Sequence, residues 1–577
     1  MMRKRCSRIT LTNREVIKMQ SQPQATQKVF LSGVLLLTLS TILVKLIGFI
    51  YKIPMLSYLG SEGMGYFHSA YEIYAICCIV ATAGLPIALS VLISTSLAEN
   101  NNREAERIWH TALTLFVIIG FLGSAFLWIL AQPICKWIQN EKALGCMIAI
   151  SPTLFFVCLS SAIRGYFQGH QRMFETAFSQ LLEALGKLIF GLLFVRFALA
   201  KGAGVAEIAA AAGWGVTAGT ILSTLYLAIE KIRFRTKLCN TNEKTKNSHS
   251  RYVEKRLLHI ALPITLGAFL ISMTKVVDMS LILRRLQAIG YTASEANAVY
   301  GSYTTLAISV FALLPTLLNS IALPLVPILS SAIASHDSQT QQKMIELSYR
   351  INSLIALPAS VGIVLFAHPI LSLLFANQEA AVSTAAPLLS ALGISIFLSC
   401  MVTATNSILH AYREVKKPIY ATLLGLLTKG VTAYILIGIP AVGILGAPIS
   451  SFLCNSVIVL LNMHYVDTLC HNINIKSLFV FPTLLSLAVV GISYGEYLLL
   501  CLGLGQNATT TLIPVATAIV LYVLIGCLLG MITQEDILAL PCGNKICQLL
   551  ERLRILSKNE LKKTSKNTCR SFHNMIK

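Results

Sequence analysis

The sequence predicts an all-α, polytopic membrane protein of about 14 transmembrane helices. Only 12% of its 577 residues are charged and 55% are hydrophobic, whereas soluble proteins carry about 25% charged residues. Apolar runs of 20 or more residues recur from Val29 to Met531, and each is long enough to cross a hydrocarbon core of about 30 Å as a helix. The short alternating segments of membrane β-barrels do not occur in the sequence, which favours helices throughout.

Two six-helix lobes are predicted, related by a parallel repeat and followed by two extra helices. Leu85-Pro86-Ile87 recurs as Leu323-Pro324-Leu325 at an offset of 238, and Lys187 matches Lys429 at an offset of 242. An even number of helices per repeat gives both lobes the same orientation, with the substrate cleft between them. The predicted division is a basic tail (1–28), an N-lobe (29–229), a linker (230–256), a C-lobe (257–463), helices 13 and 14 (464–535) and a second basic tail (536–577).

The net charge of +21 is concentrated in both tails and the linker. With the N-terminus placed in the cytoplasm, the inner segments hold 35 Lys and Arg residues and the outer loops hold 6. This asymmetry predicts that both termini and the linker are cytoplasmic. It also favours anionic membrane lipids over nucleic acid as the basic segments' partner, and a bacterial cytoplasmic membrane as the location.

Charged residues inside the apolar segments are the candidates for substrate binding and transport, because charge is costly in a bilayer. Glu183 and Lys187 are four residues apart, and Lys275 and Asp278 are three apart, so each pair is expected to share a helix face. The remaining candidates, which have no local partner of opposite sign or lie near the outer helix ends, are Lys45, Lys52, Glu72, Arg284 and Lys429.

The candidate set has a surplus of positive charge, so we expect a cationic cleft that suits an anionic ligand such as a phosphate. The matched lysines at 187 and 429 are expected to face the cleft from opposite sides. Alternatively, the charge pairs only hold helices together, and Lys45 snorkels to the membrane surface. Pro86, Pro315 and Pro324 interrupt apolar runs; these breaks favour bending during gating, although tolerated kinks explain them equally well.

No catalytic or metal-binding motif is found. The sequence has no GxxxxGK[ST] phosphate loop, no HExxH and no GxSxG, which disfavours an ATP-driven pump and leaves an ion gradient, the membrane potential or mass action as the energy source. Its 15 cysteines are scattered and are interpreted as small hydrophobic residues rather than metal ligands. We therefore predict no cofactor, no metal site and no enzymatic activity.

Several short motifs carry a family resemblance. The segments 46–54, 59–66, 83–86 and Arg164-Gly-Tyr-Phe-Gln-Gly169, with Ser179-Gln180 and Glu183, resemble the polysaccharide-biosynthesis branch of the multidrug, oligosaccharidyl-lipid and polysaccharide exporter superfamily. The branch of sporulation protein B and the lipid II flippases is the most similar. The resemblance implies alternating access, a cationic cavity, a polyprenyl-diphosphate-linked sugar as cargo and a lipid tail sheltered by the last two helices. It adds Arg164 to the candidates.

Three functions are distinguished by charge and loop length. A flippase for a lipid II-like precursor, acting as a monomer that contacts the cell-wall synthesis machinery, fits the basic surplus. A cation-coupled multidrug exporter would favour an acidic cavity. A membrane-embedded glycosyltransferase would need a catalytic acid or metal site and large outer loops, but the outer loops are short.

The predicted topology is tested by labelling single cysteines in intact cells with a reagent that does not cross membranes. Cys239 in the linker should stay unlabelled until the cells are lysed, whereas Gln506→Cys should react at once, because the two positions are predicted on opposite faces. Labelling of Cys239 in intact cells would contradict the lobe assignment.

Overall fold

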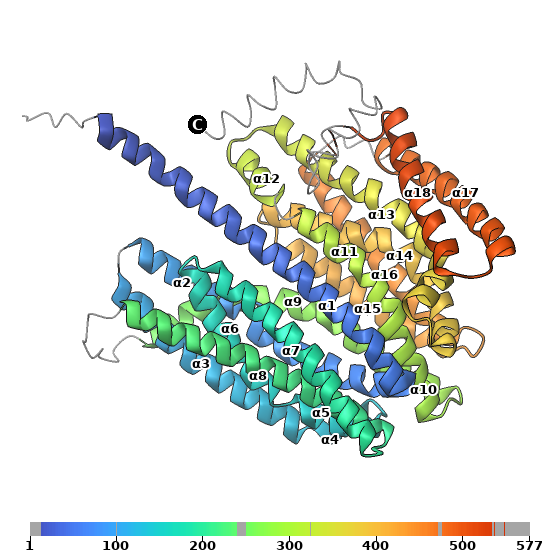
Figure 1. Cartoon of the computed structure of the whole chain (residues 1–577). Coiled ribbons are helices and arrows are strands. Elements are labelled where there is room, and N and C mark those ends of the chain that lie inside the picture. Colours follow the sequence, from blue (N-terminus) through green and yellow to red (C-terminus); the bar gives the residue numbers. More distant parts are fainter. Residues whose placement is uncertain are drawn as a thin grey trace, which may run out of the picture.

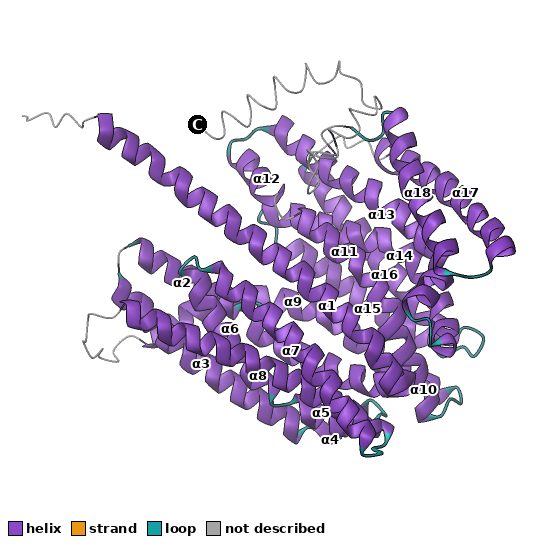
Figure 2. Cartoon of the chain, viewed as in Figure 1, coloured by secondary structure: helices purple, strands orange, loops and turns teal. Residues whose placement is uncertain are grey.

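The computed structural model describes residues 13–99, 101–238, 250–322, 325–470 and 476–533, together with Asp536 and Cys547. All regular structure in these residues is helical (Figure 2), which confirms the predicted fold class. The first half of the chain forms α1 (Asn13–Thr82), α2 (Leu85–Ala98), α3 (Asn102–Ile129), α4 (Ala131–Trp137), α5 (Leu144–Ile150), α6 (Thr153–Gly169), α7 (Met173–Ala200) and α8 (Val205–Leu238). The second half forms α9 (Ser250–Ala288), α10 (Ala293–Ser302), α11 (Ile308–Ala322), α12 (Leu325–Ala334), α13 (Ser338–Leu374), α14 (Glu379–Ala411), α15 (Lys416–Ile437), α16 (Gly446–Leu469), α17 (Phe481–Leu504) and α18 (Ala508–Leu528).

Twelve of the described helices are long and apolar enough to cross a membrane. One of them, Leu36–Ile79, has 44 residues, about 66 Å of helix and therefore roughly twice the thickness of a hydrocarbon core. It is interrupted at Gly60, whose φ of 65° only glycine adopts readily, and Figure 1 shows the chain turning back there. Two further segments bring these twelve helices to the fourteen predicted crossings. They are the second arm of α1 and the 28-residue α7, which is not among the twelve.

The helices form two groups (Figure 1). Helices α2 to α8 lie on one side of α1, and α11 to α16 lie on the other, with α17 and α18 beyond α13. α1 packs against both α7 and α10, and α9 packs against both α2 and α15. The first helix of each predicted lobe therefore contacts both groups.

Helices extend into the predicted N-terminal tail and linker. The tail is helical from Asn13, and α8 continues to Leu238 while α9 begins at Ser250, so parts of 1–28 and 230–256 are helical. These segments contain many good helix formers, which extend the membrane helices beyond their apolar parts. The prediction for the C-terminal tail lies outside the described residues apart from Asp536 and Cys547.

The three prolines predicted to interrupt helices lie at different positions relative to the helices. Pro86 is in the first turn of α2, after a break at residues 83–84, where a missing N–H leaves no helical bond unmade. Pro315 lies inside α11. Pro324 lies outside the described residues, between the end of α11 and the start of α12.

Close contacts join α1 to α10 at one end of the molecule. Ser302 Oγ on α10 donates to Ser61 Oγ on α1 at 3.0 Å, and Asn140 Nδ2, in the turn after α4, donates to Asn297 Oδ1 on α10 at 2.7 Å. The helices also approach closely, because a Cβ added at Gly301 would lie 1.9 Å from the carbonyl oxygen of Ser61. We call these contacts the α1–α10 seam. The charge asymmetry predicts that this end lies outside the cell.

Gly301→Ala should destabilise the seam, because the new methyl group would meet rigid backbone. We expect the midpoint of thermal unfolding in detergent to fall by several degrees. Gly267→Ala on α9 is the matched control, since a Cβ there would meet nothing within 4 Å and alanine favours helix. Equal midpoints for the two variants would show that the seam does not contribute to stability.

Candidate functional site

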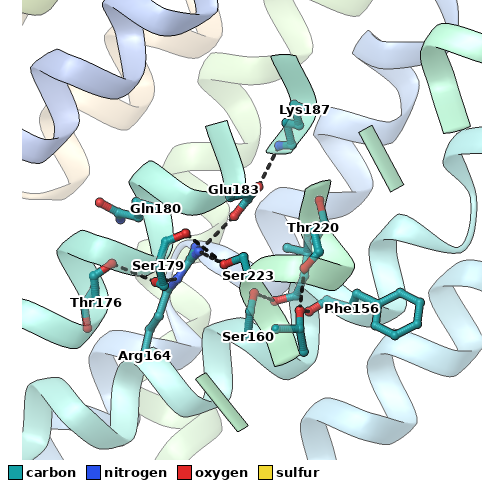
Figure 3. Close-up of polar contacts among 12 residues, drawn as sticks. Phe156, Ser160, Arg164, Thr176, Ser179, Gln180, Glu183, Lys187, Thr220 and Ser223 are labelled. Atoms are coloured by element: carbon teal, nitrogen blue, oxygen red, sulfur yellow. Dashed lines mark hydrogen bonds and ion pairs between the residues drawn. The ribbon is translucent and has the colours of Figure 1, made fainter. Parts of the chain in front are cut away.

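An ion cluster lies inside the first group of helices, where α6 faces α7 (Figure 3). Glu183 Oε2 accepts from Arg164 Nη2 at 2.8 Å, and Glu183 Oε1 accepts from Lys187 Nζ at 2.6 Å. The exposed fractions of the three side chains are only 14% for Arg164, 15% for Glu183 and 23% for Lys187. The predicted Glu183–Lys187 pair is therefore confirmed, and Arg164 completes a cluster with one excess positive charge.

Hydroxyl groups hold the Arg164 guanidinium in place (Figure 3). Its Nε donates to Ser179 Oγ at 2.9 Å on α7, and Nη2 donates to Ser223 Oγ at 3.1 Å on α8. A planar donor with five N–H groups matches this set, so the cluster ties α6, α7 and α8 together. Ser40 on α1 separately donates to Gln180 Oε1 on α7 at 3.2 Å. No sequence signal identifies Ser223, because serines are frequent in helices that have no polar site.

A separate ion pair joins α9 to α15. Asp278 Oδ2 on α9 accepts from Lys429 Nζ on α15 at 2.6 Å, and both residues are buried. The predicted pairing of Asp278 with Lys275 was therefore wrong, and Lys429, which has no local partner in the sequence, is paired with an acid on another helix. Residues three apart are separated by about 60° around a helix, so Asp278 faces α15 while Lys275 points elsewhere.

Three lysines form a further group of charges between α1 and α9. Lys45 and Lys52 are seven residues apart on one face of α1, and both interact electrostatically with Lys275 of α9. Lys45 and Lys275 are exposed, whereas Lys52 is half-buried and donates to Ser309 Oγ at 2.7 Å. Glu72, on the second arm of α1, is the acid that interacts with Lys52. We call Lys45, Lys52 and Lys275 the cationic cluster; with Glu72 it has an excess of two positive charges.

Arg284 does not belong to the cationic cluster. It is exposed, and nine residues of helix separate it from Lys275, which places the two on opposite sides of α9. The matched lysines at 187 and 429 are both paired. Each has its own carboxylate within hydrogen-bonding distance, so the charge of each lysine is compensated locally.

Among the described residues, no three His, Cys, Asp or Glu side chains are grouped in a way that would hold a metal ion.

Comparison with known proteins fits this arrangement of helices and charges. Residues 30–333, more than half of the chain, match the family model for polysaccharide biosynthesis proteins. The chain belongs to this family. Residues 263–435 also match the MatE family model, so the polysaccharide biosynthesis protein described here belongs to the superfamily that contains flippases and multidrug exporters.

The similar proteins have low sequence identity to this chain. The chain is 23% identical to stage V sporulation protein B of Bacillus subtilis (strain 168) over 430 residues, 74% of this chain and 81% of that protein. It is 22% identical to the lipid II flippase MurJ of the same organism over 417 residues, 69% of this chain and 76% of MurJ. A solved structure of lipid II flippase MurJ in an inward closed conformation has a TM-score of 0.65 at 14% identity, covering 85% of this chain and 98% of that chain. The chain therefore shares the fold of that structure.

Removing the central acid of the first ion cluster should destabilise the protein. Glu183→Gln leaves Arg164 and Lys187 without their shared carboxylate, and stranding buried charges costs about 3–5 kcal/mol. We expect a clearly lower midpoint of thermal unfolding in detergent. The double variant Glu183→Gln, Lys187→Met should recover part of the loss, since it removes one stranded cation.

Glu141→Gln, at an exposed position in the turn after α4, is the control and should leave the midpoint unchanged. If Glu183→Gln were as stable as this control, the cluster would have to be assigned a role other than holding the helices together.

Proposed function

We propose that this protein is a flippase that moves a polyprenyl-diphosphate-linked sugar, such as a lipid II-like peptidoglycan precursor, across the bacterial cytoplasmic membrane. The observation that carries the proposal is the cationic cluster. Its lysines come from α1 and α9, the first helices of the two predicted lobes, and they have one neighbouring acid. The likeness to the lipid II flippase MurJ supports the same cargo.

The chemistry of the cluster suits a diphosphate. Ammonium groups act as point charges with three donors each, so three lysines can surround a compact dianion without requiring a planar arrangement. Binding of the anion relieves the mutual repulsion of the three cations, and this relief is strongest where water is scarce. A lysine set replaces the arginines for which lipid II flippases are known, and it recognises charge rather than a fixed geometry.

Alternating access is the proposed transport cycle. The α1–α10 seam closes one end of the molecule, and the inferred topology makes that end the extracellular one. An anion that draws α1 and α9 together would strain the contacts these helices make with both groups, and the seam would separate while the cytoplasmic end closes. The protein acts as a monomer in this proposal, with both termini in the cytoplasm and the six-helix lobes as the moving units.

A multidrug exporter is the alternative, and the match of residues 263–435 to the MatE family model favours it. A cationic drug would be repelled by the cationic cluster. The two functions therefore predict opposite selectivity for the sign of the cargo's charge.

Transport is tested with the purified full-length protein in liposomes that contain fluorescent lipid II. The wild-type protein should make the labelled headgroup accessible at the opposite leaflet, and excess undecaprenyl-linked sugar should compete while a cationic dye should not. The Lys52→Gln, Lys275→Gln double variant should slow the initial rate at least about tenfold, since each lost charge contact to a phosphate is worth about 1.5–3 kcal/mol.

Arg284→Gln is the matched control, because it removes a cation from the opposite side of α9 and should leave the rate unchanged. Competition by the cationic dye, with no loss of rate in the double variant, would support the exporter and reject the flippase.

A further inference from the structure

A cavity of about 600 Å³ opens at one end of the α7–α8 hairpin, away from the cationic cluster. Its walls include Phe194 and Phe197 on α7 and Trp214 on α8, and Lys201 and Glu207 lie at the turn between the helices. The volume is within the range of small-molecule sites, about 300–1,000 Å³. The exposed fractions of Phe197 and Trp214 are 62% and 48%, so the cavity opens toward lipid.

Glycines explain why the two helices separate at this end. A Cβ added at Gly215 would lie 2.3 Å from Gly191 Cα, and one added at Gly219 would lie 2.4 Å from the backbone nitrogen of Lys187. The backbones are therefore nearly in contact at these positions, which small residues permit in membranes. Beyond them, Phe194 and Trp214 are too large for such an approach, so the helices diverge and leave the cavity between them.

The mouth of the cavity carries one charge of each sign. Lys201 lies with its Nζ 4.3 Å from the ring centroid of Phe197, and both Lys201 and Glu207 are exposed. Glu207 Oε2 accepts from the backbone nitrogen of Gly204 at 3.1 Å, which fixes the carboxylate at the turn. Lysine and tryptophan at the end of a membrane helix are typical of the headgroup level.

We propose that this cavity, which we call the hairpin groove, binds a zwitterionic phospholipid with a primary amine, such as phosphatidylethanolamine. The lipid phosphate contacts Lys201, the ammonium group donates to Glu207, and an acyl chain lies against Trp214 and Phe194. The charge pair at the mouth decides the headgroup: an ethanolamine has N–H donors for the carboxylate, a choline has none, and a phosphatidylglycerol offers no cation to Glu207. The proposal does not depend on the cargo of the transporter.

Quenching of Trp214 fluorescence tests the proposal, since a brominated acyl chain quenches only at contact. The full-length protein and its Trp214→Phe variant are reconstituted in phosphatidylcholine nanodiscs, and the difference between their emissions isolates Trp214. Brominated phosphatidylethanolamine, phosphatidylcholine or phosphatidylglycerol is then added in rising fractions. We expect half-maximal quenching at an about fivefold lower fraction of the ethanolamine lipid than of the choline lipid, the effect of one exposed ion pair.

Glu207→Gln should abolish this preference while leaving quenching by the choline lipid intact, and Lys201→Gln should weaken quenching by all three lipids. The controls are Glu141→Gln and Lys136→Gln, which are exposed at the same end of the molecule and should behave as wild type. Equal quenching by the three lipids in the wild-type protein would overturn the site. A preference for the glycerol lipid, or for the choline lipid through the aromatic rings, would overturn the assignment of Glu207 as a ligand.

Discussion

The cost of charge in a bilayer is the constraint on which this structure depends. A carboxylate or ammonium group inside the membrane must find a partner of opposite sign or reach water. Glu183 meets this requirement through Arg164 and Lys187, and Asp278 meets it through Lys429. The first set lies within one group of helices and the second joins α9 to α15, so each set stabilises the helices that it joins whichever way the two groups are oriented.

The cationic cluster differs because its charges are not compensated where they lie. Its three lysines come from α1 and α9, and these helices contact both groups. Uncompensated charge between units that move is available to a ligand, whereas charge paired inside a unit is not. The distribution of ion pairs therefore separates the residues that hold each unit together from those that we propose to meet the cargo.

Much of the fold could be predicted because lipid imposes long apolar runs and helices that satisfy their own hydrogen bonds. The Glu183–Lys187 pair also followed from local spacing. The partner of Asp278 did not, because Lys429 is 151 residues away in the sequence and a neighbour at three residues offered a simpler pair. Ser179 and Ser223 both bind the guanidinium of Arg164. They come together only because three helices pack side by side, and no local sequence pattern predicts that packing. Arg284 lies outside the cluster because nine residues of helix place it on the opposite side of α9 from Lys275, although both residues are on the same helix.

The most direct measurement of the central claim is the equilibrium affinity of the purified protein for three lipids that differ only in the headgroup: undecaprenyl alcohol, monophosphate and diphosphate. If the cationic cluster recognises phosphate charge, the affinity rises along this series, the differences shrink as salt is added, and Lys45→Gln, Lys52→Gln and Lys275→Gln each reduce the diphosphate affinity while leaving that for the alcohol unchanged. Equal affinity for the alcohol and the diphosphate at low salt would contradict the account.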